Sequence, residues 1–139
     1  MKPSEIITPD IVRWVLGMEG DNFEQESLES VDILVDEEGI QIRADDAIQE
    51  FLMDNKGFIL WNDSGVWVDT CRFIYLAIEK CAAEGWKLIM DVDEFITIWH
   101  RINGGYERRQ DFYLKDYTSF LHAQLAAIAW VYSKMQEGK

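Results

Sequence analysis

The stretch from residue 58 to residue 86 constrains the fold more than any other part of the sequence. Two short apolar runs, 58–61 and 66–68, are rich in aromatic and β-branched residues and flank the turn-forming residues 62–65. This pattern predicts a β-hairpin with a four-residue loop. Leu60 would then lie opposite Trp67 and Trp61 opposite Val66. Both faces of this ribbon are apolar, so we expect both to be covered.

An amphipathic helix should follow this hairpin directly. Asp69 or Thr70 is placed to cap its first turn, and Gly85 suits its C-terminal end. Its apolar stripe comprises Phe73, Ile74, Ala77, Ile78 and Cys81. Packing of this stripe on the hairpin is the expected core.

The N-terminal part of the chain predicts two more helices and a second hairpin. Thr8 and Pro9 have the residue types of a helix start, and Gly17 of a helix end. Alternating apolar residues around an acidic turn indicate paired strands. The expected elements are a helix over 9–16, strands over 31–35 and 40–43, and a helix from Asp45 or Asp46 to 55–57.

The C-terminal part is expected to be largely helical. After a short strand at 88–90, residues 91–94 have a capping-box pattern, and the apolar positions that follow predict a helix closed by Gly104 and Gly105. Residues 106–117 read as irregular, and a long helix is expected from Thr118 to about Met135.

These elements predict the fold class α+β, with 1–139 as a single domain. We expect two β-hairpins that form a small, mostly antiparallel sheet packed by four to five helices, with a long C-terminal helix. No apolar run approaches the roughly 20 residues that span a bilayer, and residues 1–5 lack the apolar core of a signal peptide. We therefore expect a cytoplasmic protein with no membrane partner.

Charge is the strongest functional indication. The chain has 13 basic and 26 acidic residues and a net charge of −13. Residues 1–50 hold 14 acids and three bases, a net charge of −11, whereas the other 89 residues hold 12 acids and ten bases, a net charge of −2. Such a segment disfavours direct binding to nucleic acid and steers a basic protein surface toward it.

The candidate partner-binding residues are nine acids with no Lys or Arg among them: Glu19, Asp21, Glu24, Glu26, Glu29, Asp32, Asp36, Glu37 and Glu38. Alternate strand residues lie about 6.7 Å apart and helical i, i+4 residues about 6 Å apart, so these carboxylates could imitate a row of phosphates. An ordinary solvated face and a divalent-cation site are the alternatives. Residues 36–39 lack the alternating ligands of an EF-hand loop, so we expect no metal and no cofactor.

The residues with catalytic or metal-binding chemistry form no known motif. His100, with Asp93 or Glu94 one to two helical turns earlier, leaves a small hydrolase as an alternative, but no HExxH or nucleophile-elbow spacing is present, and His122 has no helical metal partner. Cys71 and Cys81 would lie about 15 Å apart on one helix, too far for a disulfide. They are expected to be free core thiols.

One basic-aromatic patch lies between Arg101 and Tyr117. Its members are Arg101, Tyr106, Arg108, Arg109, Phe112, Tyr113, Lys115 and Tyr117. Such a patch is typical of nucleic-acid binding, but Glu107, Asp111 and Asp116 dilute its charge. Ion pairing with the acidic third of the chain, or self-association into a homodimer, is the preferred interpretation.

The leading hypothesis is a non-enzymatic inhibitor that blocks a basic partner by charge mimicry. A nuclease, a nucleic-acid-binding protein or a ribonucleoprotein would suit it, and immunity proteins or phage anti-defence DNA mimics are matching biological settings. The alternative is a regulatory or assembly subunit that binds through an aromatic surface. Tryptophans left exposed beside the acidic residues would favour a binding role.

Overall fold

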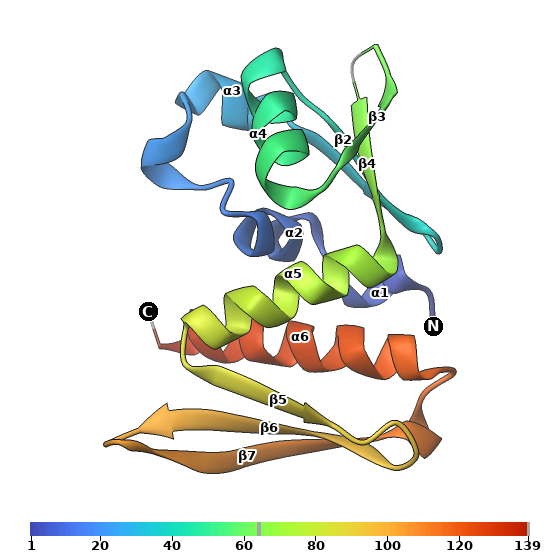
Figure 1. Cartoon of the computed structure of the whole chain (residues 1–139), viewed down its shortest axis with the longest axis vertical. Helices are drawn as coiled ribbons and strands as arrows, with labels where there is room; N and C mark the ends of the chain where they lie inside the picture. The colour runs from blue at the N-terminus through green and yellow to red at the C-terminus, as the bar shows by residue number, and fades with distance from the viewer. Residues whose placement is uncertain (64, 139) are drawn as a thin grey trace. The chain divides into compact units, whose positions relative to one another are not determined.

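The computed structural model describes residues 1–63 and 65–138, with every side chain among them except that of Asp21. The chain divides into two compact units, an N-terminal unit from Lys2 to Leu76 and a C-terminal unit that begins at Ala77. Each unit has its own antiparallel sheet (Figure 1), which confirms the α+β class. That residues 1–139 form one domain stays a prediction.

The N-terminal unit contains the predicted sheet of two hairpins. Its four strands are antiparallel and lie in the order β1-β2-β4-β3, so β1 and β3 form the edges. The strands are β1 (Asp32–Val35), β2 (Gly39–Arg43), β3 (Ile59–Asn62) and β4 (Gly65–Asp69).

Two helices of this unit, Pro9–Leu16 and Asp46–Lys56, begin and end where the sequence predicts, whereas the short helices at Pro3–Ile6, Gly20–Asn22 and Gln25–Glu29 are not predicted. Thr8 Oγ1 accepts a hydrogen bond from Ile11 N at 3.3 Å, and Asp45 Oδ1 accepts one from Ile48 N at 3.1 Å. Gly17 caps the C-terminus of the helix Pro9–Leu16 in the left-handed conformation. The elements are α1 (Pro3–Ile6), α2 (Pro9–Leu16), η1 (Gly20–Asn22), α3 (Gln25–Glu29) and α4 (Asp46–Lys56).

The four-stranded sheet has one covered face and one open face. The covered face carries the fully buried Ile40, Ile42, Val66 and Val68, and α4 packs against β4 (Figure 1). On the open face the strand register aligns one residue from each strand in a row: Leu34, Gln41, Trp67 and Ile59. Alternation of side chains along each strand therefore leaves three apolar residues and Gln41 in a row on the open face.

The predicted register of the central hairpin is wrong by one residue. Leu60 lies opposite Val66 rather than Trp67, and a β-bulge follows Leu60 before Asn62 pairs with Gly65. The expected four-residue loop is shorter because Asn62 and Gly65 belong to the strands; Ser64, also assigned to that loop, lies outside the described residues. The bulge adds one residue to β3 and so moves each earlier pairing by one position.

Strand β3 is also not covered on both sides. Ile59, Leu60 and Trp61 are 58%, 61% and 51% exposed. The expectation of a ribbon buried on both faces is therefore wrong: in β4, Val66 and Val68 are buried on one face, whereas Trp67 on the other face is only half-buried. As the outermost strand, β3 has a neighbour on one side only.

Helix α5 (Thr70–Ala83) contains the boundary between the two units. The expected cap is present, because Asp69 Oδ1 accepts a hydrogen bond from Arg72 N at 2.7 Å. Four of its predicted core residues are buried: Phe73, Ile74, Ala77 and Cys81. The predicted helix is confirmed.

The C-terminal unit is a three-stranded sheet in the order β5-β6-β7, with α6 against it (Figure 1). Its elements are β5 (Trp86–Met90), β6 (Phe95–Ile102), β7 (Gly105–Tyr113), η2 (Leu114–Asp116) and α6 (Phe120–Glu137). Ser119 caps α6, which confirms the long C-terminal helix.

Two predictions for this unit are wrong. Residues 95–102 are a strand, not a helix, and much of the stretch predicted to be irregular is strand β7. Asn103 and Gly104 have φ angles of 42° and 85°, which suit a tight type I′ hairpin turn between β6 and β7. None of the helices in the described part of the chain has the length and apolar content that crossing a bilayer requires.

Candidate protein-binding surface

The nine candidate acids lie within residues 19–38, which we call the acidic segment. The first part of this segment lies on η1 and α3. Glu19, Glu24, Glu26 and Glu29 are exposed, whereas the side chain of Asp21 lies outside the described residues. Glu26 and Glu29 are three residues apart on α3 and therefore project from the same side of it. A regular phosphate-like row of carboxylates would need a strand or a longer helix. Helix α3 has only five residues, so it presents one such pair and not a long row.

Two contacts fix this segment to α4. The ring of Phe23 meets that of Phe51 edge to face, with 5.2 Å between the centroids. The Ser27 hydroxyl hydrogen-bonds the Asp45 carboxylate at the start of α4 and, as the main cause, lowers the pKa of that carboxyl. The exposed glutamates are thus presented from a segment with a defined position in the N-terminal unit.

The second part of the acidic segment lies on the β1–β2 hairpin. Asp32 is exposed and lies opposite Arg43, and Glu37 and Glu38 are exposed in the turn. Asp36 has a different role. Its Oδ1 accepts hydrogen bonds from the backbone N–H groups of Glu38 at 2.8 Å and Gly39 at 2.9 Å, so this carboxylate stabilises the turn itself.

The negative charge belongs almost entirely to the N-terminal unit. Residues 2–76 hold 17 acids and five bases, a net charge of −12, whereas the rest of the chain holds nine acids and eight bases, a net charge of −1. Among the side chains that the structure describes, none of the candidate acids is ion-paired with a lysine or arginine. Apart from Asp36, whose carboxylate binds its own turn, these acids therefore direct their charge to solvent.

The same unit exposes the apolar side chains of β3. A hollow of about 270 Å³ beside this strand is lined by Ile59, Trp67, Asp69 and Arg72, with Gly57 and Val68. The sequence predicts the apolar character of β3 but not its exposure, because periodicity does not show which strand of a sheet is outermost. Trp61 is an exposed tryptophan of the kind that favours partner binding.

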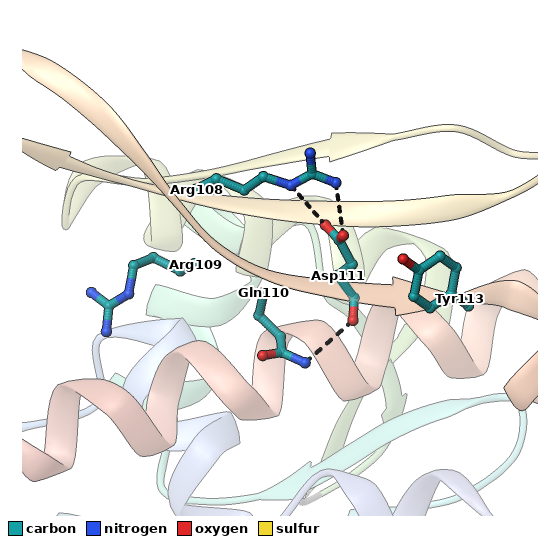
Figure 2. Close-up of a pocket in the computed structure, with 5 residues that line it drawn as sticks. All are labelled: Arg108, Arg109, Gln110, Asp111 and Tyr113. Carbon is teal, nitrogen blue, oxygen red and sulfur yellow. Dashed lines mark hydrogen bonds and ion pairs between the residues drawn. The ribbon is translucent and has the colours of Figure 1, made fainter.

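Two arginines of the basic-aromatic patch, Arg108 and Arg109, contact neighbours within the C-terminal unit. Arg108 holds Asp111 through two hydrogen bonds, Nε to Oδ1 at 3.2 Å and Nη2 to Oδ2 at 2.7 Å, beside a shallow hollow of about 370 Å³ (Figure 2). This pairing lowers the pKa of Asp111 and raises that of Arg108. Arg108 thus pairs with its own strand, not with the acidic third of the chain.

Arg109 points away from that pair (Figure 2). Its guanidinium lies 5.5 Å from the centre of the Trp86 ring, and its Nη1 lies 3.4 Å from His100 Nδ1. His100 itself stacks on Trp86 with 3.9 Å between the ring centroids and 11° between the planes. His100 is therefore part of a stacked cluster on the sheet.

The structure does not bring the residues of the hydrolase alternative together. Asp93 and Glu94 lie in the turn before β6, and His100 lies near the far end of that strand. Six residues of strand span about 20 Å, so no general acid–base pair forms. His122 Nδ1 instead lies 2.7 Å from Ser119 Oγ at the start of α6.

The side chains that could bind a metal ion or act as reactive thiols were predicted to form no site. In the described residues, no three His, Cys, Asp or Glu side chains are grouped so that they could hold a metal ion. Cys81 is a buried thiol whose pKa burial raises to about 12, as expected of a core residue. Cys71 is exposed, so its prediction as a core thiol is wrong.

Two groups of exposed residues remain as candidate sites, one acidic and one apolar, and both lie in the N-terminal unit. The acids occupy η1, α3 and the β1–β2 hairpin, and the apolar residues occupy β3. No protein-family model, no curated protein and no solved structure matches this chain.

Proposed function

We propose that this protein is a non-enzymatic inhibitor that binds a basic partner through the acids of residues 19–38. Exposed carboxylates without lysine or arginine partners, on a segment fixed to α4, are the observation that carries this proposal. In the complex these carboxylates take the place of phosphates in a cationic groove of the partner.

The anchoring of the segment supports binding as well as steering. A charge of −12 on one unit attracts a cationic protein over distances near the Debye length. Because Phe23 and Ser27 already hold the segment in place, less conformational entropy is lost when a partner binds. Affinity then depends on carboxylates presented in a set arrangement.

The partner class follows from the chemistry of the surface. Nucleases, nucleic-acid-binding proteins and ribonucleoproteins have grooves lined with Lys and Arg for phosphate. We infer a cytoplasmic role of the immunity or anti-defence type, such as a phage-encoded DNA mimic, with no cofactor. Direct binding to nucleic acid is not part of this proposal, because the charge repels phosphate.

The test is a triple charge reversal, Glu24→Lys, Glu26→Lys and Glu29→Lys. Asp36 is left unchanged because its carboxylate stabilises the β1–β2 turn. The matched control reverses the exposed Glu79, Glu107 and Asp116, which changes the net charge equally but in the C-terminal unit.

Wild type should capture a basic protein from cell lysate at low salt and prevent the captured protein from binding nucleic acid. The control variant should behave like wild type, the triple reversal should lose capture, and wild-type affinity should fall steeply with salt. Equal capture by wild type and the triple reversal would contradict charge mimicry.

A second candidate function is a regulatory or assembly subunit that binds through aromatic residues. The 51% exposure of Trp61, beside exposed Ile59 and Leu60, favours it. In that case binding would persist at high salt and fail in Trp61→Ala, whereas the triple charge reversal would have little effect.

A further inference from the structure

We propose that β3 takes up an extended segment of a cationic protein partner, which becomes a fifth strand of the N-terminal sheet. The charge of that partner rests on the proposed function, whereas the mode of attachment rests on the geometry of β3 itself. In this mode, backbone hydrogen bonds supply affinity and side-chain contacts supply selectivity.

Strand β3 lacks the features that usually protect an edge. Edge strands tend to carry a charged residue or a proline that prevents pairing with another chain. Residues 59–62 have neither, and the side chains of Ile59, Leu60 and Trp61 are each more than half exposed. The bulge of the strand comes only after Leu60.

The direction of the backbone groups in the sheet can be followed from two hydrogen bonds at the ends of β2. Asp36 N donates to Gly39 O at 3.0 Å, so Gly39 uses its carbonyl on the β1 side. Thr70 N donates to Glu38 O at 3.1 Å, so Glu38 uses its carbonyl on the β4 side. In antiparallel sheets these directions alternate residue by residue, so Ile40 and its partner Val68 bond to each other.

The same alternation determines which backbone groups of β3 point away from β4. Because Val68 points its backbone groups toward β2, Trp67 points its own toward β3 and bonds to Ile59. The N–H and C=O of Leu60 therefore point outward from the sheet. Phe58, two residues earlier, has the same direction, and its N–H donates to Leu52 O at 3.2 Å rather than to β4.

The surroundings of β3 offer contacts for side chains of an added strand. Alternate residues of that strand would lie over the hollow formed by Ile59, Trp67 and Asp69. Arg72 also lines this hollow, and Asp69 Oδ1 already caps α5, so the hollow suits an apolar side chain or the aliphatic stem of a lysine rather than its charged head. The exposed ring of Trp61 is a surface for a cation.

Charge favours a cationic partner over a second copy of the chain. Pairing two β3 strands would bring together two units that each carry a net charge of −12. No cation within residues 59–62 offsets this repulsion. An extended segment rich in Lys or Arg relieves it.

The probe for the test is a short fluorescein-labelled peptide in which lysine and valine alternate. Binding to the full chain is followed by fluorescence anisotropy, and protection of the Leu60 amide by hydrogen exchange in NMR spectra. The control peptide has the same sequence with alternate backbone nitrogens methylated, which keeps its charge and removes hydrogen-bond donors from one edge.

Two variants of the protein remove the docking edge by different means. Leu60→Pro deletes the outward N–H and leaves the bonds to β4 in place, and Leu60→Lys adds an edge-protecting charge. Ile59→Pro is the matched contrast, because it deletes an N–H that bonds Trp67 and should destabilise the fold. Circular dichroism and melting temperature show which variants remain folded.

The inference predicts that the unmethylated peptide binds, protects Leu60 and binds each Leu60 variant about tenfold more weakly. Equal binding of the methylated peptide, equal binding by both Leu60 variants, or no binding at all would overturn it. A dimer of the chain that Leu60→Pro dissociates would place a second copy on β3 instead and also overturn it.

The proposed function can fail independently. If only the Glu24, Glu26 and Glu29 reversal weakens peptide binding, charge mimicry stands and strand addition is wrong. If only the Leu60 variants weaken it, strand addition stands and the acidic segment is not the binding surface.

Discussion

Phe23 and Phe51 meet edge to face with 5.2 Å between their ring centroids, and this pair joins the acidic segment to helix α4. The segment has few other apolar residues to hold it: α3 has no buried residue. The contact therefore decides whether the neighbouring glutamates have a fixed arrangement or a fluctuating one.

Replacing Phe23 with alanine should lower the free energy of unfolding by roughly 1–2 kcal/mol and weaken binding of a basic partner without changing any charge. Urea denaturation measures the first effect and a partner titration the second. Phe51→Ala and the double variant complete a mutant cycle. The sum of the stability losses in the two single variants should exceed the stability loss in the double variant. Simple additivity would show that the ring contact contributes no stability.

The Ser27–Asp45 hydrogen bond predicts a pH dependence of stability. The pKa of Asp45 is lower in the folded protein than its ordinary value of 3.8. Its contribution to stability is therefore fully present above the unfolded pKa and is lost as the pH falls through the lower, folded pKa. Urea midpoints measured between about pH 5 and pH 2 should fall less steeply for Asp45→Asn than for wild type. If the urea midpoints of Asp45→Asn and wild type fall in parallel with pH, protonation of the Asp45 carboxylate does not change the stability of the fold.

Gly39 should not tolerate a side chain. A Cβ there would overlap the Val68 carbonyl oxygen and lie 2.7 Å from Trp67 Nε1, so the indole packs where a side chain would be. Gly39→Ala should lower the free energy of unfolding by roughly 1–3 kcal/mol. In Gly105→Ala the new methyl group meets nothing within 4 Å, so this control should change stability by less than about 0.5 kcal/mol. Equal melting temperatures of Gly39→Ala and Gly105→Ala would contradict the close approach of Trp67 to Gly39.

The two cysteines should differ sharply in reactivity. Cys71 is exposed, whereas Cys81 is buried with its pKa raised to about 12, so little thiolate forms there at neutral pH. Ellman's reagent should therefore modify one thiol rapidly in the native protein and both in urea. Cys71→Ala should abolish the rapid phase, and its survival would place the reactive thiol at Cys81.

The sequence predicts α2, α4, α5 and the β1–β2 hairpin because their signals are local. Thr8, Asp45 and Asp69 each cap the helix that their residue type and position indicate. The acidic turn at 36–39 joins two strands as expected. These features depend on neighbouring residues, so composition and spacing are enough to identify them.

The error at residues 95–102 has a specific cause. Apolar residues at 95, 98, 99 and 102 fit a helical period, but Ile96, Ile98 and His100 alternate as in a strand. The Asn103-Gly104 pair, a strong hairpin signal, supports the strand interpretation. The cap-like residues at 91–94 form a turn, in which Asp91 Oδ1 accepts a hydrogen bond from Asp93 N.

The properties of the candidate site that depend on tertiary structure could not be predicted. The bulge after Leu60 changes the register, and the strand order β1-β2-β4-β3 makes β3 an edge. Neither is encoded in residues 58–68 alone, because both depend on which strands pair. The identity of the acidic residues was readable from the sequence, but the commitment of Asp36 to its own turn was not.

The bare edge of β3 makes the solubility of this protein conditional on its solvent. Many proteins protect such a strand with a lysine or proline within it, a safeguard located on the strand itself. Here the safeguard is repulsion between whole molecules, which salt screens and which vanishes near the isoelectric point of about 4.4. Acidification or high salt should therefore lower the colloidal stability of the protein before it unfolds.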